Sequence, residues 1–234
     1  MAYRVPSLVG QYELRQRTVL QQVYAWMAGG LTITGLVALW AAQSSFFLNL
    51  LARNPGMMFG LIIAQLVVVL GLSFGIGRMS ATVAMGAFVL YAALNGLTMS
   101  VIFLIYTAES IGATFLVTAG MFAGISLYGY TTKRDLSGMG SFLVMALIGV
   151  ILASLVNFFL KSTALYWVIT YVGILVFVGL TAYDTQKIKR MSATLDGNND
   201  TLMLKRVVIM GALTLYLDFV NMFLFLLRIF GRRN

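Results

Sequence analysis

Residues 207–230 read VVIMGALTLYLDFVNMFLFLLRIF, and this stretch decides the fold. The run is long enough to cross a bilayer as a helix, which takes about 20 mostly apolar residues. Its apolar residues are continuous and do not alternate with polar ones, which favours a helix over a strand of a membrane β-barrel. An acidic residue, Asp218, lies near the midpoint of the run. The sequence therefore predicts a transmembrane helix that carries a carboxyl group deep in the bilayer.

Six further apolar runs precede this one along the chain. They span Val23–Ala42, Met57–Gly77, Ala81–Tyr106, Ile111–Tyr130, Met139–Leu160 and Ala164–Asp184. The 234 residues are 60% hydrophobic and 10% charged, whereas soluble domains hold about 25% charged residues. We therefore predict an all-α integral membrane protein whose seven-helix transmembrane domain covers residues 21–234. Residues 1–20 are polar and are predicted to form a tail or an amphipathic interfacial helix.

The composition excludes several function classes. The chain has no Cys and no His, so it has no disulfides, thiolate metal sites, Ser-His-Asp triads or His-ligated zinc. The net charge of +9 comes from short Lys and Arg clusters between the apolar runs. Such clusters are typical of membrane flanks that face anionic lipid. We expect the lipid bilayer as the main partner, no nucleic acid and no enzyme activity.

The distribution of Lys and Arg predicts the orientation. With the N-terminus in the cytoplasm, eleven of the 16 Lys and Arg residues fall on the cytoplasmic side and five on the other, as the positive-inside rule favours. Arg232 and Arg233 do not fit this pattern, because seven full crossings would place them outside. Either the last segment is re-entrant or the rule is overridden there, and the sequence leaves both open.

Two pairs of glycines match the spacing of close helix contacts in membranes. These pairs are Gly71-xxx-Gly75 and Gly120-xxx-Gly124, and small residues at this spacing let helix backbones approach each other. Ordinary bundle packing is one interpretation, and a gating hinge is the other.

Asp218 shares one face of its helix with other polar residues. Thr214, Asp218 and Asn221 follow each other at four- and three-residue spacing, which places them on one side of a helix. A carboxylate at the bilayer centre costs at least about 3 kcal/mol, so such residues face an aqueous cavity or a partner. The face is therefore predicted to point into the bundle, either for a function or for a structural hydrogen bond from a protonated Asp218.

Two other acids lie in or at the apolar runs. Asp184 ends the sixth run close to Lys187, so it is either a functional group or a solvated residue at the membrane interface. Glu109 lies in a tight connection before the fourth run. Capping of the following helix or a contact with its dipole explains Glu109 as well as a role in ion access.

One basic residue stands apart from the others. Arg78 follows the second run and is the only charge between Arg53 and Glu109. It is either a membrane anchor or, since it would lie on the same side as Asp184, the partner of that carboxylate. A guanidinium–carboxylate pair would be strong and directional in such a setting.

Three short motifs resemble the Bax inhibitor-1 family, also called the transmembrane Bax inhibitor motif family. They are LYLDFVN at residues 215–221, YDTQ at residues 183–186 and KRDL at residues 133–136. The resemblance covers nearly the whole chain, and the short chain looks like a bacterial member of the inner membrane.

The resemblance implies a seven-helix bundle with the last helix at its centre and a pH-sensitive calcium leak. By motif, the pH-sensing pair would be Asp184 and Asp218, and Arg78 would be the latch that holds one of them.

Elementary electrostatics agrees with this implication. Two carboxylates close together in a poorly solvated site do not both ionise cheaply, so they are expected to share a proton and titrate as a unit. Calcium prefers six to eight hard oxygen ligands. Asp184 and Asp218, with Asn221, Thr214 and water, could therefore supply a weak, transient calcium site, and no tightly bound cofactor is expected. Weak binding suits a leak, because the ion must leave as readily as it enters.

Three other functions remain open. Two aspartates on consecutive helices also occur in intramembrane aspartyl proteases, where they act as a general acid/base pair. The second Asp of that class follows Gly-x-Gly, however, whereas Asp218 follows Leu-Tyr-Leu, and the downstream Pro-Ala-Leu element is missing. A proton-coupled cation carrier and a regulatory membrane scaffold, with protein partners unknown, are the remaining alternatives.

Overall fold

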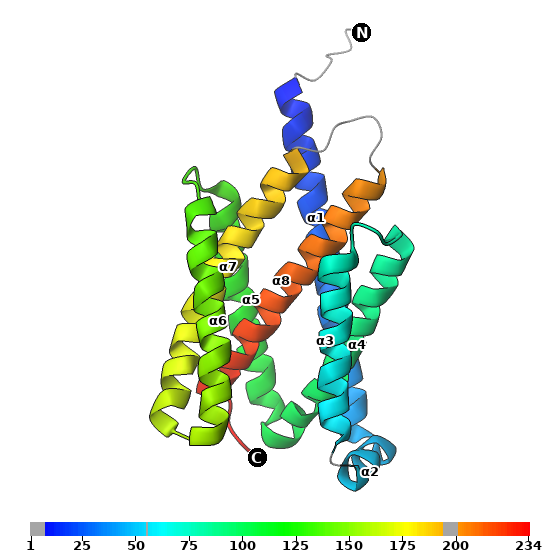
Figure 1. Ribbon diagram of the computed structural model, residues 1–234, viewed down its shortest axis with the longest axis vertical. Coiled ribbons are helices and arrows are strands. Elements are labelled where there is room, and N and C mark those ends of the chain that lie inside the picture. The colour runs from blue at the N-terminus through cyan, green and yellow to red at the C-terminus, as the bar shows by residue number, and fades with distance from the viewer. Residues whose placement is uncertain (1–7, 55, 194–200) are drawn as a thin grey trace. The chain divides into compact units, whose positions relative to one another are not determined.

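The computed structural model describes residues 8–54, 56–193 and 201–234. In these ranges the chain is almost entirely helical (Figure 1). The helices are α1 (Leu8–Gln43), α2 (Ser45–Arg53), α3 (Met57–Gly75), α4 (Ala81–Ile105), α5 (Ala108–Thr131), α6 (Ser137–Leu160), α7 (Thr163–Ala193) and α8 (Thr201–Phe230).

Seven of the helices that the structure describes are long and apolar enough to cross a membrane, all except α2. They match the seven predicted runs, and most ends agree within a few residues. The prediction of an all-α integral membrane protein is therefore confirmed. The polar residues 8–20 are helical and continuous with the first span, while residues 1–7 lie outside the described part.

Two features of the helices were not predicted. Helix α2 is too short to cross a bilayer, and it begins where Ser44 caps it by accepting a hydrogen bond from the Phe47 backbone N–H at 3.3 Å. Helix α7 continues to Ala193 and does not end at Asp184. A loss of hydropathy marks where a helix leaves the apolar layer, but the backbone hydrogen bonds continue until a residue disfavours them.

The chain divides into two compact units. The first unit consists of residues 1–101 and 188–213. In it, α4 packs against α1, where the Thr34 hydroxyl donates to the Ala92 carbonyl at 2.8 Å. Gly96 permits this approach, because a Cβ there would overlap the Thr34 carbonyl. Gln65 of α3 donates to Thr98 Oγ1 of α4 at 3.0 Å, so polar contacts join the three helices.

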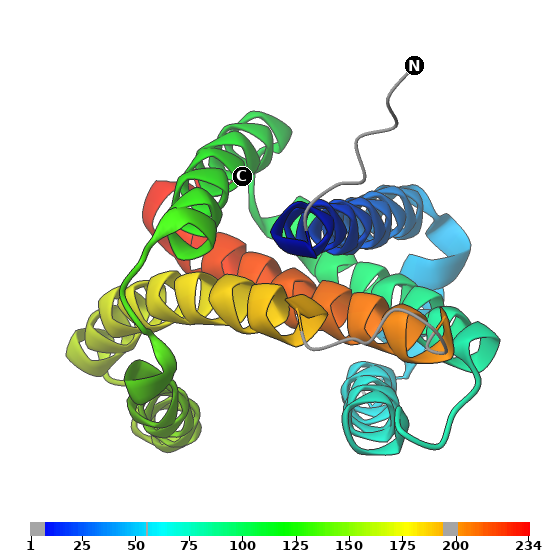
Figure 2. The same cartoon turned by 90° about the horizontal axis from the view of Figure 1, so that it is seen from above.

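The second unit consists of residues 102–187 and 214–234. Seen from above, α7 and the second half of α8 run side by side, with α5 and α6 flanking them (Figure 2). The α5–α8 contact is aromatic, since Phe219 meets Phe115 and Phe122 edge to face at 5.3 and 5.5 Å. The α6–α7 contact uses Gly140, where a Cβ would overlap the ring of Tyr183.

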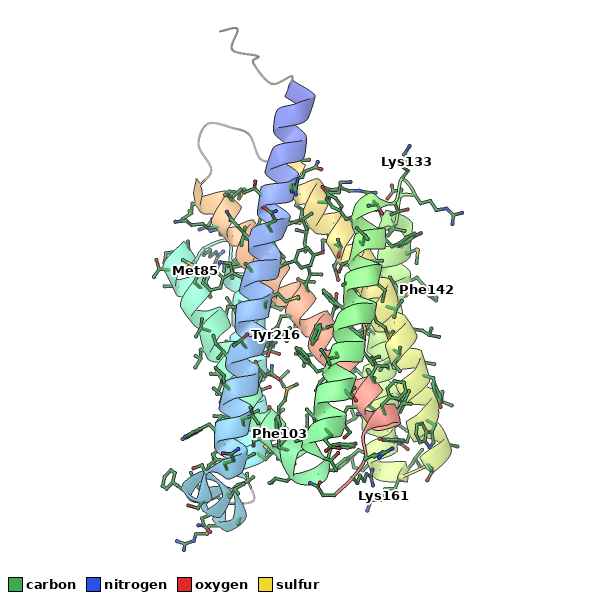
Figure 3. The ribbon with its side chains drawn as sticks, turned by 180° about the vertical axis from the view of Figure 1, so that it is seen from behind. Met85, Phe103, Lys133, Phe142, Lys161 and Tyr216 are labelled. Carbon is green, nitrogen blue, oxygen red and sulfur yellow. The ribbon has the colours of Figure 1, made fainter. Side chains whose placement is uncertain are left out.

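The ends of α6 mark the two ends of the second unit. Lys133, before α6, and Lys161, after it, lie at opposite ends in Figure 3. Residues 231–234 lie along the α4–α5 connection, where the Thr107 N–H donates to the Arg232 carbonyl and the Asn234 N–H to the Ile105 carbonyl, both at 2.9 Å. This segment therefore pairs with the connection as a short extended piece.

Helix α8 contributes its first half to one unit and its second half to the other. In its most apolar stretch 72% of the residues are buried, against 6–33% in the other six spans. Helix α8 is therefore the most buried of the seven spans among the residues that the structure describes. The helix is also continuous over 30 residues, which is about 45 Å at 1.5 Å per residue and long enough to cross a bilayer.

Candidate functional site

Asp218 lies in the middle of α8 and is buried. Its side chain is 4% exposed, and its neighbours Leu215 and Tyr216 are fully buried. The carboxyl oxygen Oδ2 has no hydrogen-bond partner among the residues that the structure describes. Because nearly all buried polar atoms in proteins are paired, this oxygen indicates a position for water or a cation.

Asp184 is the second buried acid of the same unit. Its side chain is 8% exposed, and it belongs to the same compact unit as Asp218. The burial of the Asp184 side chain does not fit the alternative of a solvated residue, and α7 continues for nine residues beyond it. Lys187 lies one turn on along α7, and its ammonium is 5.8 Å from the centre of the Tyr183 ring.

The rest of the YDTQ motif supports the position of Asp184. Thr185 is buried, and its Oγ1 lies 3.5 Å from Ser126 Oγ of α5. The Gln186 side chain accepts from the Leu136 N–H at 2.9 Å and donates to the Arg134 carbonyl at 2.8 Å. Gln186 thus ties α7 to the α5–α6 connection, a role that was not predicted although the residue lies within the motif.

The predicted supporting residues of α8 are half-buried. Asn221 donates to the Leu217 carbonyl of its own helix at 2.8 Å, so its amide N–H serves the backbone. Thr214 lies one turn before Asp218 on the same helix. The structure therefore keeps Thr214, Asp218 and Asn221 on one helix face, as predicted.

Glu109 is exposed in the first turn of α5. The capping side chain of this helix is Thr107, which accepts from the Ser110 N–H at 3.3 Å. The position of Glu109 still suits a negative charge at a helix N-terminus. Glu109 also lines a cavity of about 310 Å³ together with Thr114 and Arg232.

Arg78 lies in the exposed turn after α3, in the first unit, whereas the aspartate pair belongs to the second. The latch contact with Asp184 stays a prediction. The same turn is held by Arg206 of α8, whose Nε and Nη2 donate to the Met79 carbonyl at 3.2 and 2.8 Å. This contact was not predicted, because a backbone carbonyl as partner leaves no sequence signal.

The oxygen ligands that are available limit how tightly a metal ion can bind. In the part of the chain that the structure describes, no three acidic side chains lie close enough together to hold a metal ion. Two carboxyl groups with hydroxyl, carbonyl and water oxygens could bind Ca²⁺ only weakly, since tight sites use several carboxylates.

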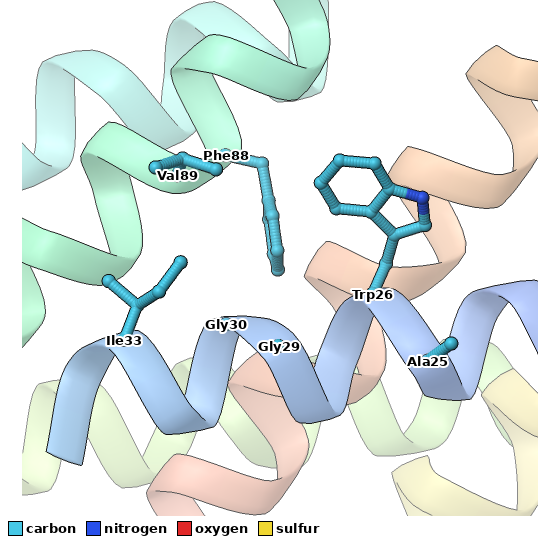
Figure 4. A pocket seen from close by; sticks show the side chains of 7 residues that line it. All are labelled: Ala25, Trp26, Gly29, Gly30, Ile33, Phe88 and Val89. Atoms are coloured by element: carbon cyan, nitrogen blue, oxygen red, sulfur yellow. The ribbon is translucent and has the colours of Figure 1, made fainter. Parts of the chain in front are cut away.

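A second cavity, of about 210 Å³, lies between α1 and α4 in the first unit (Figure 4). Gly29 and Gly30 leave the space, and Trp26 and Phe88 line it with rings 6.2 Å apart. Its lining has no ionisable side chain, so it offers no chemistry for moving protons or metal ions.

Comparison with known proteins agrees with the motifs. Residues 16–234 match the family described as "Inhibitor of apoptosis-promoting Bax1". The "Inner membrane protein YbhL" of Escherichia coli is 59% identical over 218 residues, 93% of each chain. An uncharacterized protein of Rickettsia prowazekii is 44% identical over 220 residues, which are 93% of this chain and 91% of the relative. One of Borreliella burgdorferi is 42% identical over 215 residues, 92% of each chain. The chain is thus a bacterial member of the Bax inhibitor-1 family of multi-pass membrane proteins.

Proposed function

We propose that the protein is a pH-sensitive calcium leak, in which Asp184 and Asp218 form the group that senses protons and binds the passing ion. The observation that carries the proposal is the burial of two carboxyl groups in the same compact unit. Repulsion and poor solvation oppose a doubly ionised pair. The charge of the pair therefore changes with pH, and a cation stabilises its ionised form.

A leak also requires that the ion is released. The unpartnered Oδ2 of Asp218 is available to a hydrated cation, while the small number of carboxylates keeps the site weak. Arg78 is proposed as the latch that binds Asp184 in a closed state. Calcium and protons would then compete for the same two carboxyl groups.

The protein is proposed to lie in the bacterial inner membrane with its N-terminus in the cytoplasm. The name of the Escherichia coli relative supports the location, and the distribution of Lys and Arg supports the orientation. Reporters fused after Arg134 and after Arg190 should both be cytoplasmic. A periplasmic signal from either fusion would overturn the orientation.

The direct test is calcium flux into proteoliposomes over a pH series. We expect flux in the wild type that changes with pH, and a flat profile in Asp184→Asn and Asp218→Asn. Asp135→Asn is the matched control, because Asp135 is exposed in the α5–α6 connection and Asn also caps helices well. A wild type without flux, or two variants with the wild-type profile, would contradict the proposal.

The same experiment separates the leak from its nearest alternative. A proton-coupled carrier built on the same acids would move calcium only against a counterflow of protons. Under an imposed calcium gradient and without an uncoupler, a carrier must move protons in the opposite direction, which a pH-sensitive dye inside the vesicles records. A leak equilibrates calcium without this coupled proton movement.

A further inference from the structure

Helix α5 carries a buried face of hydroxyl groups. Ser110, Thr114, Thr118 and Ser126 are at most 9% exposed and are spaced four and eight residues apart. At 3.6 residues per turn they form a buried stripe that winds slowly around the helix, by about 40° for every four residues. We call these four residues the α5 hydroxyl face. Phe122 occupies the remaining position of the same face and is also buried.

One end of the α5 hydroxyl face opens into the cavity at the α4–α5 connection. Glu109, Ser110 and Thr114 line this cavity of about 310 Å³. Thr114 is 1% exposed, yet its Oγ1 has no hydrogen-bond partner among the described residues. A threonine with a purely structural role in a membrane helix usually donates its hydroxyl hydrogen to a backbone carbonyl, as Thr118 does to the Thr114 carbonyl at 2.7 Å. The unpartnered hydroxyl therefore points to a polar occupant of the cavity.

The other end of the face contacts α7 at the residue that follows Asp184. Ser126 Oγ lies 3.5 Å from Oγ1 of Thr185, the residue next to Asp184 in the chain. Two buried polar side-chain atoms lack a hydrogen-bond partner in the described part of the chain, and they are Thr114 Oγ1 and Asp218 Oδ2. From Thr114 to Ser126 the helix rises about 18 Å at 1.5 Å per residue, and the hydroxyl face lies along this distance.

An aromatic contact interrupts the face between Thr118 and Ser126. The ring of Phe122 meets that of Phe219 of α8 at 5.5 Å, edge to face, and Phe219 is the neighbour of Asp218 in the chain. An apolar constriction can close a route by excluding water and opens when the rings separate.

We propose that the α5 hydroxyl face is the path along which the ion passes between the aspartate pair and the cavity at Glu109, with Phe122 and Phe219 as its constriction. The proposal rests on the proposed leak and adds its route on this side of the pair. Hydroxyl oxygens suit a hydrated hard cation. The cavity at the mouth is lined by both Glu109 and Arg232, and there the carboxylate of Glu109 offsets the repulsion of the cation by the guanidinium.

The test uses the absence of native cysteines. Thr114→Cys is treated in proteoliposomes with a positively charged, membrane-impermeant methanethiosulfonate, which reacts with thiolates in water. Leu116→Cys is the control, because Leu116 lies half a turn away and is 71% exposed toward lipid. We expect fast modification of Thr114→Cys with loss of calcium flux, and no modification of Leu116→Cys.

A second pair of variants separates the hydroxyl from the shape of the side chain. Thr114→Val should lower calcium flux about fivefold, the effect of one lost polar contact, and Thr114→Ser should retain it. The route is wrong if the wild type conducts while Thr114→Cys is as unreactive as Leu116→Cys, or if its modification leaves flux unchanged. A wild type without flux would instead contradict the proposed function, and the thiol reactivity would still report whether water reaches Thr114.

Discussion

Helices α6 and α8 are both apolar enough to cross a membrane, but they occupy opposite environments. The more apolar of the two, α6, has 11% of its central stretch buried, whereas the less apolar α8 has 72% buried. In lipid, apolar side chains gain nothing by leaving the tails, so packing and polar contacts decide which helix is enclosed. Helix α8 carries Asp218 and Asn221 in its second half, and α6 carries no charged residue. The comparison teaches that polar side chains, and not hydropathy, identify the inner helix of this protein.

The largest expected effect is on stability. Leu227 of α8 is 1% exposed and Leu155 of α6 is 58% exposed. Leu227→Ala leaves a cavity and should lower the free energy of unfolding by about 3 kcal/mol. Leu155→Ala leaves a gap that lipid fills and should cost less than about 0.5 kcal/mol. Unfolding in mixed micelles measures both changes. Equal losses of unfolding free energy would contradict the difference in burial between α6 and α8.

The next effect concerns the polar interior. If Asp184 and Asp218 share a proton, each of Asp184→Asn and Asp218→Asn should reduce the change of flux between about pH 6 and pH 8 to less than about twofold. The double variant should lose little more than either single one, because the two groups act as a unit. Asp218→Asn should be the more severe single change, since Asp218 is the more buried acid. Simple addition of the two effects would show that each aspartate acts alone.

A smaller effect is expected from the exposed turn after α3. Arg78→Ala removes the cation that would stabilise the closed state, so the basal leak should rise about threefold, the size of a solvent-screened ion pair. The pH response should shift but persist. Arg53→Ala, which removes another exposed arginine of the same unit, is the control. A leak equal to that of the wild type in folded Arg78→Ala would make Arg78 a membrane anchor.

The smallest effect is expected at the mouth of the cavity. Glu109→Gln should lower calcium flux about twofold and Arg232→Gln should raise it about twofold, with both effects fading at high salt. The backbone contacts of residue 232 remain in the second variant. Lys161→Gln, at the end of the lipid-facing α6, should change nothing. Equal effects of all three variants would mean that only the net surface charge matters.

The membrane spans were predictable because an apolar run of about 20 residues has few alternatives to a helix. The ends were less predictable, as α7 shows, because hydropathy does not report backbone hydrogen bonds. The spacing of small residues did not predict where the helices come close together. At Gly71, Gly120 and Gly124 a Cβ would meet no neighbouring atom within 4 Å. The close helix approaches use other glycines, such as Gly129 beneath the Ala182 carbonyl, because spacing alone does not tell which face is buried.

The acids of the candidate site were visible in the sequence because buried charge is costly and therefore conspicuous. The burial of Asp184 was not decided by its position at the end of an apolar run, since a charged segment can continue as an enclosed helix. The sequence did not mark Thr114 as a functional residue either, because the hydroxyl of a threonine in a membrane helix usually forms a hydrogen bond with a backbone carbonyl of the same helix. Its unpartnered hydroxyl is a property of three-dimensional packing.

The pairing of residues 231–234 with the α4–α5 connection has a consequence for biosynthesis. The Arg232 N–H donates to the hydroxyl of Ser110 at 3.2 Å, across 122 positions of the chain. The first unit likewise takes residues 188–213 from beyond the whole of α5 and α6. The helices that are synthesised first therefore remain incompletely packed in the membrane until the ribosome has made the later segments of the chain. Nascent chains arrested before residue 188 should accordingly be sensitive to membrane proteases and dependent on insertion factors that shield unfinished helices.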